Sequence, residues 1–283
     1  MSHRSHFPFL LLAALAMAAA SLSAATVEIY DVPPTEVLNT QFTVTVNGQP
    51  VPVIESGHRN YPTDQSGRRV YAHFSFEGTV EIEVTGLDGH NLRPLEFGIV
   101  PSVHTSDRIV FTLDRPRYMI LTRHSNTVED ALFLFADPID PRAPNPDAPE
   151  VLNYANFTGS INAALMEVAK REELDVLYVP PGTWPSGGVI DIPSNVTLYL
   201  DGGAKITNGL LRFRNVENAH VRGRGVLDFN RDGRNDFGFG IAGVDSQNIS
   251  VHGVIARSAN NWNTAIRHSR GIDILYLKVL NTN

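Results

Sequence analysis

The chain has 283 residues, of which 42% are hydrophobic and 19% charged, so it can bury a sizeable core and is not intrinsically disordered. Its net charge of −7 has the wrong sign for a general nucleic-acid binder. The absence of cysteine excludes a disulfide framework, a thiolate metal site and a thiol nucleophile. Residues 26–150 carry 9 basic and 18 acidic side chains, whereas residues 151–283 carry 13 and 12, and this difference predicts two domains.

The N-terminal residues have the pattern of a secretory signal. Arg4 precedes an apolar run of 14 residues from Phe7 to Ala20, and small residues before Ala25 provide a cleavage site. A run of this length is too short for a membrane span, which needs about 20 residues. We therefore expect a signal peptide over residues 1–25, a secreted or periplasmic protein, and no membrane partner.

Short alternating strands are predicted over residues 26–136. Val80–Val84 alternates apolar and acidic residues, which is typical of a strand with one solvated face. Thr43–Val46 runs into Asn47-Gly48, a pair that favours a tight hairpin turn. Further strand-like segments follow at intervals of about ten residues, at 109–113, 118–121 and 132–135. These features predict an antiparallel β-sandwich.

Residues 137–150 hold five prolines. Proline fixes φ and removes a backbone donor, so this segment is expected to be a stiff, extended linker between the two domains.

The second domain, residues 151–283, is predicted to begin with a helix and to continue as a repeat. Ile161, Leu165 and Val168 fall on one face of a helix expected between Thr158 and Glu173. A turn residue followed by apolar residues at alternate positions then recurs four times, in steps of 23, 30 and 23 residues. The four turn residues are Asn195, Asn218, Asn248 and Gly271.

This spacing predicts an all-β chain in which the sandwich is followed by a right-handed parallel β-helix with an N-terminal capping helix. A second antiparallel sandwich is the alternative, but it would not explain the repeated unit. The asparagines are expected at the corners of the coils, with their side chains bonded to nearby backbone.

Three segments resemble the start of glycoside hydrolase family 28, the polygalacturonases: Leu177–Trp184, Ser194–Ala204 and Val221–Asp228. The preceding sandwich and Pro-rich linker resemble family 49, the dextranases and isopullulanases. The resemblance implies a pectin-lyase-like β-helix that binds a polysaccharide. It also implies inverting hydrolysis of α-glycosidic bonds, with one carboxyl group as general acid and a second as general base.

The resemblance does not assign catalytic residues. The family carries its aspartates in an Asn-Thr-Asp segment and a later Asp-Asp pair, whereas this chain reads Asn281-Thr282-Asn283 near the first place and contains no Asp-Asp pair. We therefore expect a fragment with an incomplete β-helix that stops before the catalytic aspartates, and whether this chain is itself an enzyme stays open.

Two binding sites are expected from the sequence. Trp262, with its neighbour Asn261, is placed where an aromatic ring could stack on a sugar, the alternative being that Trp262 packs in the core. A second segment has oxygen-bearing side chains at positions 1, 3, 5 and 9 of a calcium-type loop, the alternative being a solvated turn. Its four candidate ligands are Asp228, Asn230, Asp232 and Asp236. Phe239 stands at position 12, where such a loop requires Glu.

The sequence thus predicts a secreted polysaccharide hydrolase. Two alternatives are a non-catalytic carbohydrate-binding β-helix and a polysaccharide lyase on the same fold, for which calcium would be a natural cofactor.

Overall fold

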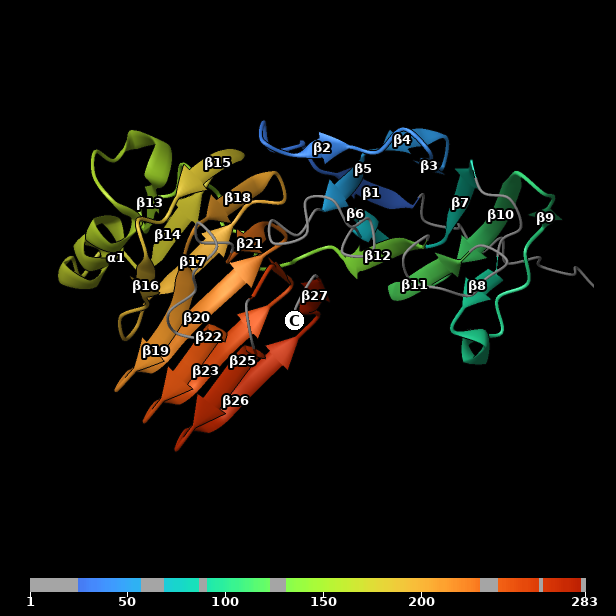
Figure 1. The fold of residues 1–283 in the computed structure, drawn as a ribbon. Coiled ribbons are helices and arrows are strands. Elements are labelled where there is room, and N and C mark those ends of the chain that lie inside the picture. The colour runs from blue at the N-terminus through green and yellow to red at the C-terminus, as the bar shows by residue number, and fades with distance from the viewer. Residues whose placement is uncertain are drawn as a thin grey trace, which may run out of the picture.

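The computed structural model describes residues 25–56, 69–86, 91–122, 131–229, 239–259 and 262–280, so the predicted signal peptide lies almost wholly outside them. Within these ranges the chain is nearly all β, with one α-helix, α1 (Ile161–Lys170). Figure 1 shows the sandwich strands beside a stack of parallel strands. In the described part, no helix is long and apolar enough to cross a membrane.

The N-terminal part consists of two sheets. The first contains β2 (Val37–Leu38), β5 (Val53–Ser56), β6 (Arg69–Glu77), β12 (Leu132–Pro138), β11 (Arg117–Thr122) and β8 (Asn91–Arg93), with β1 (Thr26–Ile29) also paired to β6. The second contains β4 (Gln49–Val51), β3 (Thr43–Val46), β7 (Val80–Thr85), β10 (Arg108–Leu113) and β9 (Val103–His104). The predicted turn joins β3 to β4, with φ of 49° at Asn47 and 75° at Gly48.

The two sheets share one hydrophobic core. Ile82 and Phe111 from the second sheet pack in the same cluster as Phe74 and Leu134 from the first, and all four are fully buried. One strand pair differs from the antiparallel prediction, because β12 runs parallel to β6. Strands so far apart in sequence are joined by long connections that impose no antiparallel register, so the short-range pattern could not predict this pair.

The second part is built from three parallel sheets, here called faces 1, 2 and 3. Face 1 contains β13 (Val151–Asn153), β14 (Val176–Val179), β17 (Thr197–Leu200), β20 (Glu217–Gly223), β23 (Gln247–His252) and β26 (Arg270–Leu275). Face 2 contains β15 (Gly182–Pro185), β18 (Ala204–Thr207), β21 (Val226–Asp228), β24 (Ile255–Arg257) and β27 (Lys278–Leu280). Face 3 contains β16 (Val189–Asp191), β19 (Leu210–Arg214), β22 (Phe239–Val244) and β25 (Trp262–Arg267).

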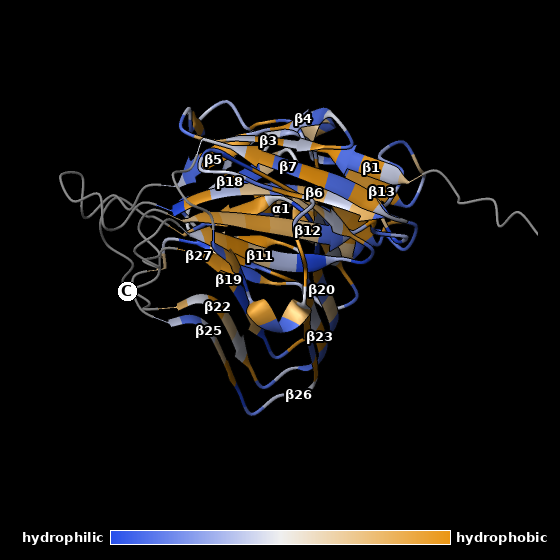
Figure 2. Cartoon of the chain, turned by 90° about the vertical axis from the view of Figure 1, so that its right-hand side faces the viewer, coloured by the Kyte–Doolittle hydropathy of each residue, from blue (hydrophilic) through white to orange (hydrophobic). Residues whose placement is uncertain are grey.

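The chain visits the three faces in turn, and the neighbouring strands within each face pair in parallel, as illustrated by β17 with β20 and β20 with β23. The predicted right-handed parallel β-helix is therefore confirmed, and the alternative of a second antiparallel sandwich is wrong. Leu198, Val221 and Val251 occupy the same register and are buried in one stack inside the coil. Figure 2 shows hydrophobic residues concentrated on the strands and hydrophilic residues on the turns between them.

The corners between faces 3 and 1 are made by the repeated turn residues. Asn195, Asn218 and Asn248 have φ of 61°, 53° and 51°, a left-handed conformation that asparagine tolerates better than most residues. Their position at the corners is confirmed. Their side-chain amides bond to one another, however, and not to the nearby backbone as expected. Asn218 Nδ2 donates to Asn195 Oδ1 at 3.0 Å, and Asn248 Nδ2 donates to Asn218 Oδ1 at 2.6 Å. The amides therefore form a ladder that ties successive coils together.

The helix α1 covers the first coil, at the end of the stack opposite β26 (Figure 1). It begins after Ser160, whose Oγ accepts a hydrogen bond from the N–H of Ala163 at 3.1 Å, and it is shorter than the predicted segment. Its apolar side, with Ile161, Leu165 and Val168, packs into the core of the β-helix. The end of the stack is thereby closed.

The sandwich packs against face 2 of the β-helix. Tyr71 and Phe135 from the first sandwich sheet share a buried cluster with Val226 and Ile255 from face 2. Between β12 and β13 no strand forms, and residues 139–150 pass along face 1, where Arg142 Nη2 lies 3.0 Å from His252 Nδ1. The two parts therefore meet over an apolar core and are also linked by the connecting segment.

Candidate functional site

Two aromatic rings lie side by side on face 3. The parallel register of β22 and β25 places Phe239 opposite Trp262, with ring centroids 5.9 Å apart and planes inclined at 55°. Trp262 is 60% exposed and lies on β25, the edge strand of face 3 among the described strands. The guanidinium of Arg267 lies 5.7 Å from the centre of the Phe239 ring and steadies it. Asn261, which was predicted together with Trp262 as a sugar-binding residue, lies outside the described residues.

The outward side of face 3 carries both small and charged side chains. Leu211 and Ile241 point into the core, so their neighbours Arg212 and Ala242, together with Ala265 in the same register, face outward. Arg212 is held by Asp191, with Nη2–Oδ2 at 2.8 Å. Phe239 and Trp262 are in step with Ile241 and Thr264 along the strands, so they alternate with this outward set. Trp262 is exposed on β25, which pairs on one side only among the described strands.

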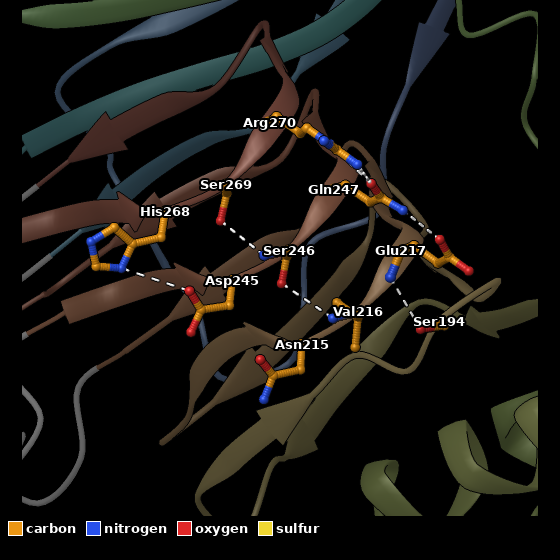
Figure 3. A pocket seen from close by; sticks show the side chains of 10 residues that line it. All are labelled: Ser194, Asn215, Val216, Glu217, Asp245, Ser246, Gln247, His268, Ser269 and Arg270. Atoms are coloured by element: carbon orange, nitrogen blue, oxygen red, sulfur yellow. Dashed lines mark hydrogen bonds and ion pairs between the residues drawn. The ribbon is translucent and has the colours of Figure 1, made fainter.

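A polar groove of about 560 Å³ runs along the corner between faces 3 and 1. Figure 3 shows that its lining side chains are bonded to one another from coil to coil. Ser246 N donates to Ser269 Oγ at 3.1 Å, and Arg270 donates to Gln247 Oε1 at 2.6 Å. Gln247 in turn donates to Glu217. Because these groups already satisfy each other, the groove stabilises the stack of coils, and we do not assign it to a ligand.

Asp228, the first of the four predicted calcium ligands, lies in a buried ionic network. Its Oδ2 accepts from Arg257 Nε at 3.0 Å and Nη2 at 2.9 Å. Arg257 Nη2 also donates to Glu36 of the sandwich at 2.7 Å, and Lys205 Nζ lies 3.0 Å from the same carboxylate. The network joins the two domains, and no local sequence pattern could reveal it because Glu36 and Arg257 are 221 residues apart.

The other three predicted calcium ligands, Asn230, Asp232 and Asp236, lie outside the described residues. Among the residues that the structure describes, no group of three or more His, Asp or Glu side chains could hold a metal ion. The calcium site stays a prediction, and the part of it that is placed, Asp228, already neutralises a guanidinium.

A row of titratable side chains lies on face 1. Arg142 donates to His252 Nδ1, which leaves the proton on Nε2 for donation to Asp273 Oδ2 at 2.9 Å. One step along the row, His220 Nδ1 lies 2.8 Å from Ser250 Oγ, and burial lowers the pKa of His220 from 6.5 to about 4. These histidines are therefore neutral near pH 7 and serve as hydrogen-bonded rungs between coils.

Comparison with known proteins supports the fold. No protein-family model and no curated protein matches the sequence. Among solved structures, Dex49A from Penicillium minioluteum superimposes with a TM-score of 0.62 at 16% identity, over 90% of this chain and 60% of that chain. The family 28 exopolygalacturonase of Yersinia enterocolitica gives a TM-score of 0.37 at 12% identity, over 91% of this chain and 57% of that chain. The chain thus spans about 60% of the length of Dex49A and shares its fold.

Proposed function

We propose that this chain is the substrate-binding N-terminal part of a secreted polysaccharide hydrolase, and that a neutral α-linked glucan lies along face 3. The observation that carries the proposal is the exposed Trp262 beside Phe239, on the edge strand of face 3 in a fold that Dex49A shares. Aromatic rings held open to solvent on a rigid sheet are what a sugar polymer needs for stacking. In this proposal Trp262 is the residue on which the sugar stacks, and Phe239 and Arg267 support it. Asn261, its neighbour in sequence, stays a predicted contact of the bound polymer.

The reaction proposed for the whole enzyme is inverting hydrolysis. It requires a general acid and a general base about 6.5–9.5 Å apart, with a water molecule between the base and the anomeric carbon. The aspartates that perform these steps in the resembled families have no counterpart at the matching positions of this sequence. We therefore assign binding, and no catalytic step, to the residues of this chain.

One observation favours a neutral glucan over galacturonan. The fold match to Dex49A includes the sandwich as well as the β-helix, because it covers 90% of the chain. Charge does not separate the two polymers, because residues 151–283 carry 13 basic and 12 acidic side chains. Galacturonan binding, a purely non-catalytic carbohydrate-binding role and a calcium-dependent lyase are the alternatives that the experiment must separate.

The test is retention of the purified chain in native gels that contain dextran, α-1,3-glucan or galacturonan, together with reducing-sugar release from each. We expect retention by a neutral glucan and about tenfold weaker retention for Trp262→Ala. Leu95→Ala is the matched control, because Leu95 is an apolar residue of the sandwich with 66% exposure. Retention by galacturonan alone, or equal retention of both variants, would refute the proposal, and release of unsaturated products with calcium would favour a lyase.

A further inference from the structure

A second cavity, of about 650 Å³, lies where the sandwich, the connecting segment and the β-helix meet. Its walls come from β1 and the residues after it, from Asp140 and Ala143 of the connecting segment, and from the corner that follows β17. This junction cavity is separate from the Trp262 face, because it opens between faces 1 and 2 whereas Trp262 lies on face 3. Its volume falls within the range of about 300–1,000 Å³ that is usual for small-molecule sites.

The lining of the junction cavity is rich in hydrogen-bond acceptors. Four carboxylates contribute to it, from Glu28, Asp31, Asp140 and Asp201. Asp31 is exposed, and no described residue donates a hydrogen bond to its carboxylate. The single cation in the lining, Arg224, is already committed, since it donates to Ser75 Oγ, to Gly223 O and to Pro138 O. The cavity therefore presents net negative charge, with the Asp31 carboxylate open to a donor, whereas Asp140 and Asp201 already accept from Arg142 N and Tyr178 Oη.

The side chain of Tyr199 lines the same space. Tyr199 is only 6% exposed, it lines the cavity, and no described residue forms a hydrogen bond with its hydroxyl. Burial, with a further contribution from the nearby Asp140, raises its pKa above the ordinary value, so the hydroxyl keeps its proton. Its ring stacks on Tyr178 with planes inclined at 13° and centroids 6.0 Å apart. The hydroxyl of this stacked ring is therefore available to a ligand or to water on the cavity side.

Another part of the wall of the junction cavity is formed by Tyr30, which is held in place by its contacts. The Tyr30 ring lies against the backbone of Gly202, where a side chain would collide with it. Tyr30 is anchored at its tip, because its hydroxyl donates to Ser75 Oγ at 2.6 Å. The cavity is thus bounded by two tyrosine rings in set positions, with the carboxylates around them.

We propose that the junction cavity is a second carbohydrate site, which binds an uncharged oligosaccharide at the domain boundary. Sugar hydroxyls donate to the carboxylates of Asp31 and Asp140, and one of them bonds the Tyr199 hydroxyl. The same negative charge rejects uronic acids, whose carboxylates would face like charge in a partly dehydrated space. The site would hold a neighbouring length of the polymer or a branch, and it does not depend on the stacking role proposed for Trp262.

The experiment is calorimetric titration of the chain with isomaltotriose, trigalacturonic acid and CaCl₂, each alone. We expect isomaltotriose to bind and trigalacturonic acid to be rejected. Tyr199→Phe should weaken isomaltotriose binding about 5-fold, the value of one neutral hydrogen bond, and Asp31→Asn should weaken it by a similar factor. Neither change removes a hydrogen bond within the described structure, and unchanged urea unfolding will verify that both variants are folded.

Trp262→Ala separates this inference from the proposed function. Isomaltotriose binding that survives Trp262→Ala and falls with Tyr199→Phe supports the junction site, whatever the gels show for the polymer. Isomaltotriose binding that is abolished by Trp262→Ala and unaffected by Tyr199→Phe overturns it. Tight binding of CaCl₂ without binding of either sugar would also overturn it, in favour of a cation site.

Discussion

Replacing Glu36 by Gln tests how strongly the two domains are held together. The Glu36 side chain is 2% exposed and Arg257 is 5% exposed, with Oε1 and Nη2 2.7 Å apart. Lys205, 7% exposed, lies 3.0 Å from the same oxygen, and Asp228 completes a set of two acids and two bases. Glutamine keeps the shape of the Glu36 side chain but removes its negative charge, so one positive charge of the buried network is left without a counter-charge. Removing one partner of a buried pair costs about 3–5 kcal/mol, so we expect a loss of about 3 kcal/mol in the free energy of unfolding.

Urea unfolding followed by circular dichroism measures this loss. Glu83→Gln is the matched control, because Glu83 pairs with Arg108 at 2.8 Å on the surface, with side chains 33% and 46% exposed, and such pairs contribute less than about 1 kcal/mol. The double variant Glu36→Gln/Lys205→Met restores neutrality and should recover part of the loss. Equal effects of Glu36→Gln and Glu83→Gln, or a double variant with strictly additive losses, would refute a buried network that links the domains.

Three further predictions follow from buried or repeated groups. Burial lowers the pKa of His73 from 6.5 to about 3, so stability that is present above pH 6.5 is lost as the pH falls through this window. The free energy of unfolding should drop by about 2–3 kcal/mol between pH 7 and 4.5, less so in His73→Gln, and a flat profile would contradict this. Asn218→Ala breaks the amide ladder at a left-handed corner and should cost about 1–2 kcal/mol in urea unfolding, whereas Asn153→Ala, at a 3₁₀ cap, leaves the ladder intact. Leu275 and Val279 are exposed on β26 and β27, which pair on one side only among the described strands. Open strand edges favour association, so light scattering of residues 26–283 should show oligomers, and a monodisperse monomer would contradict this prediction.

The repeat made the β-helix predictable, because each coil needs an apolar strand followed by a corner that only a few residues tolerate. Asn195, Asn218 and Asn248 mark these corners in the sequence, and the structure places all three in the left-handed region. Trp262 was singled out as a residue that could stack on a sugar, but its exposure depends on its neighbours in space and could not be read from the strand pattern.

What the sequence could not show is how the two domains contact each other. Glu36 accepts a hydrogen bond from Arg257 only because the sandwich packs against face 2. For the same reason Asp140 and Tyr199 line one cavity. Such contacts join segments that are far apart in the chain and have no local periodicity. The parallel pairing of β12 with β6 was missed for the same reason.

The central claim is that a neutral glucan stacks on Trp262, and tryptophan fluorescence measures this contact directly. The chain has two tryptophans, and Trp184→Phe removes the other one, which is partly buried and donates to Pro180 O. In that background the emission comes from Trp262 alone. We predict a saturable blue shift with dextran oligosaccharides and none with oligogalacturonates. Unchanged emission under conditions in which the same variant is retained by dextran in the gel would contradict the account.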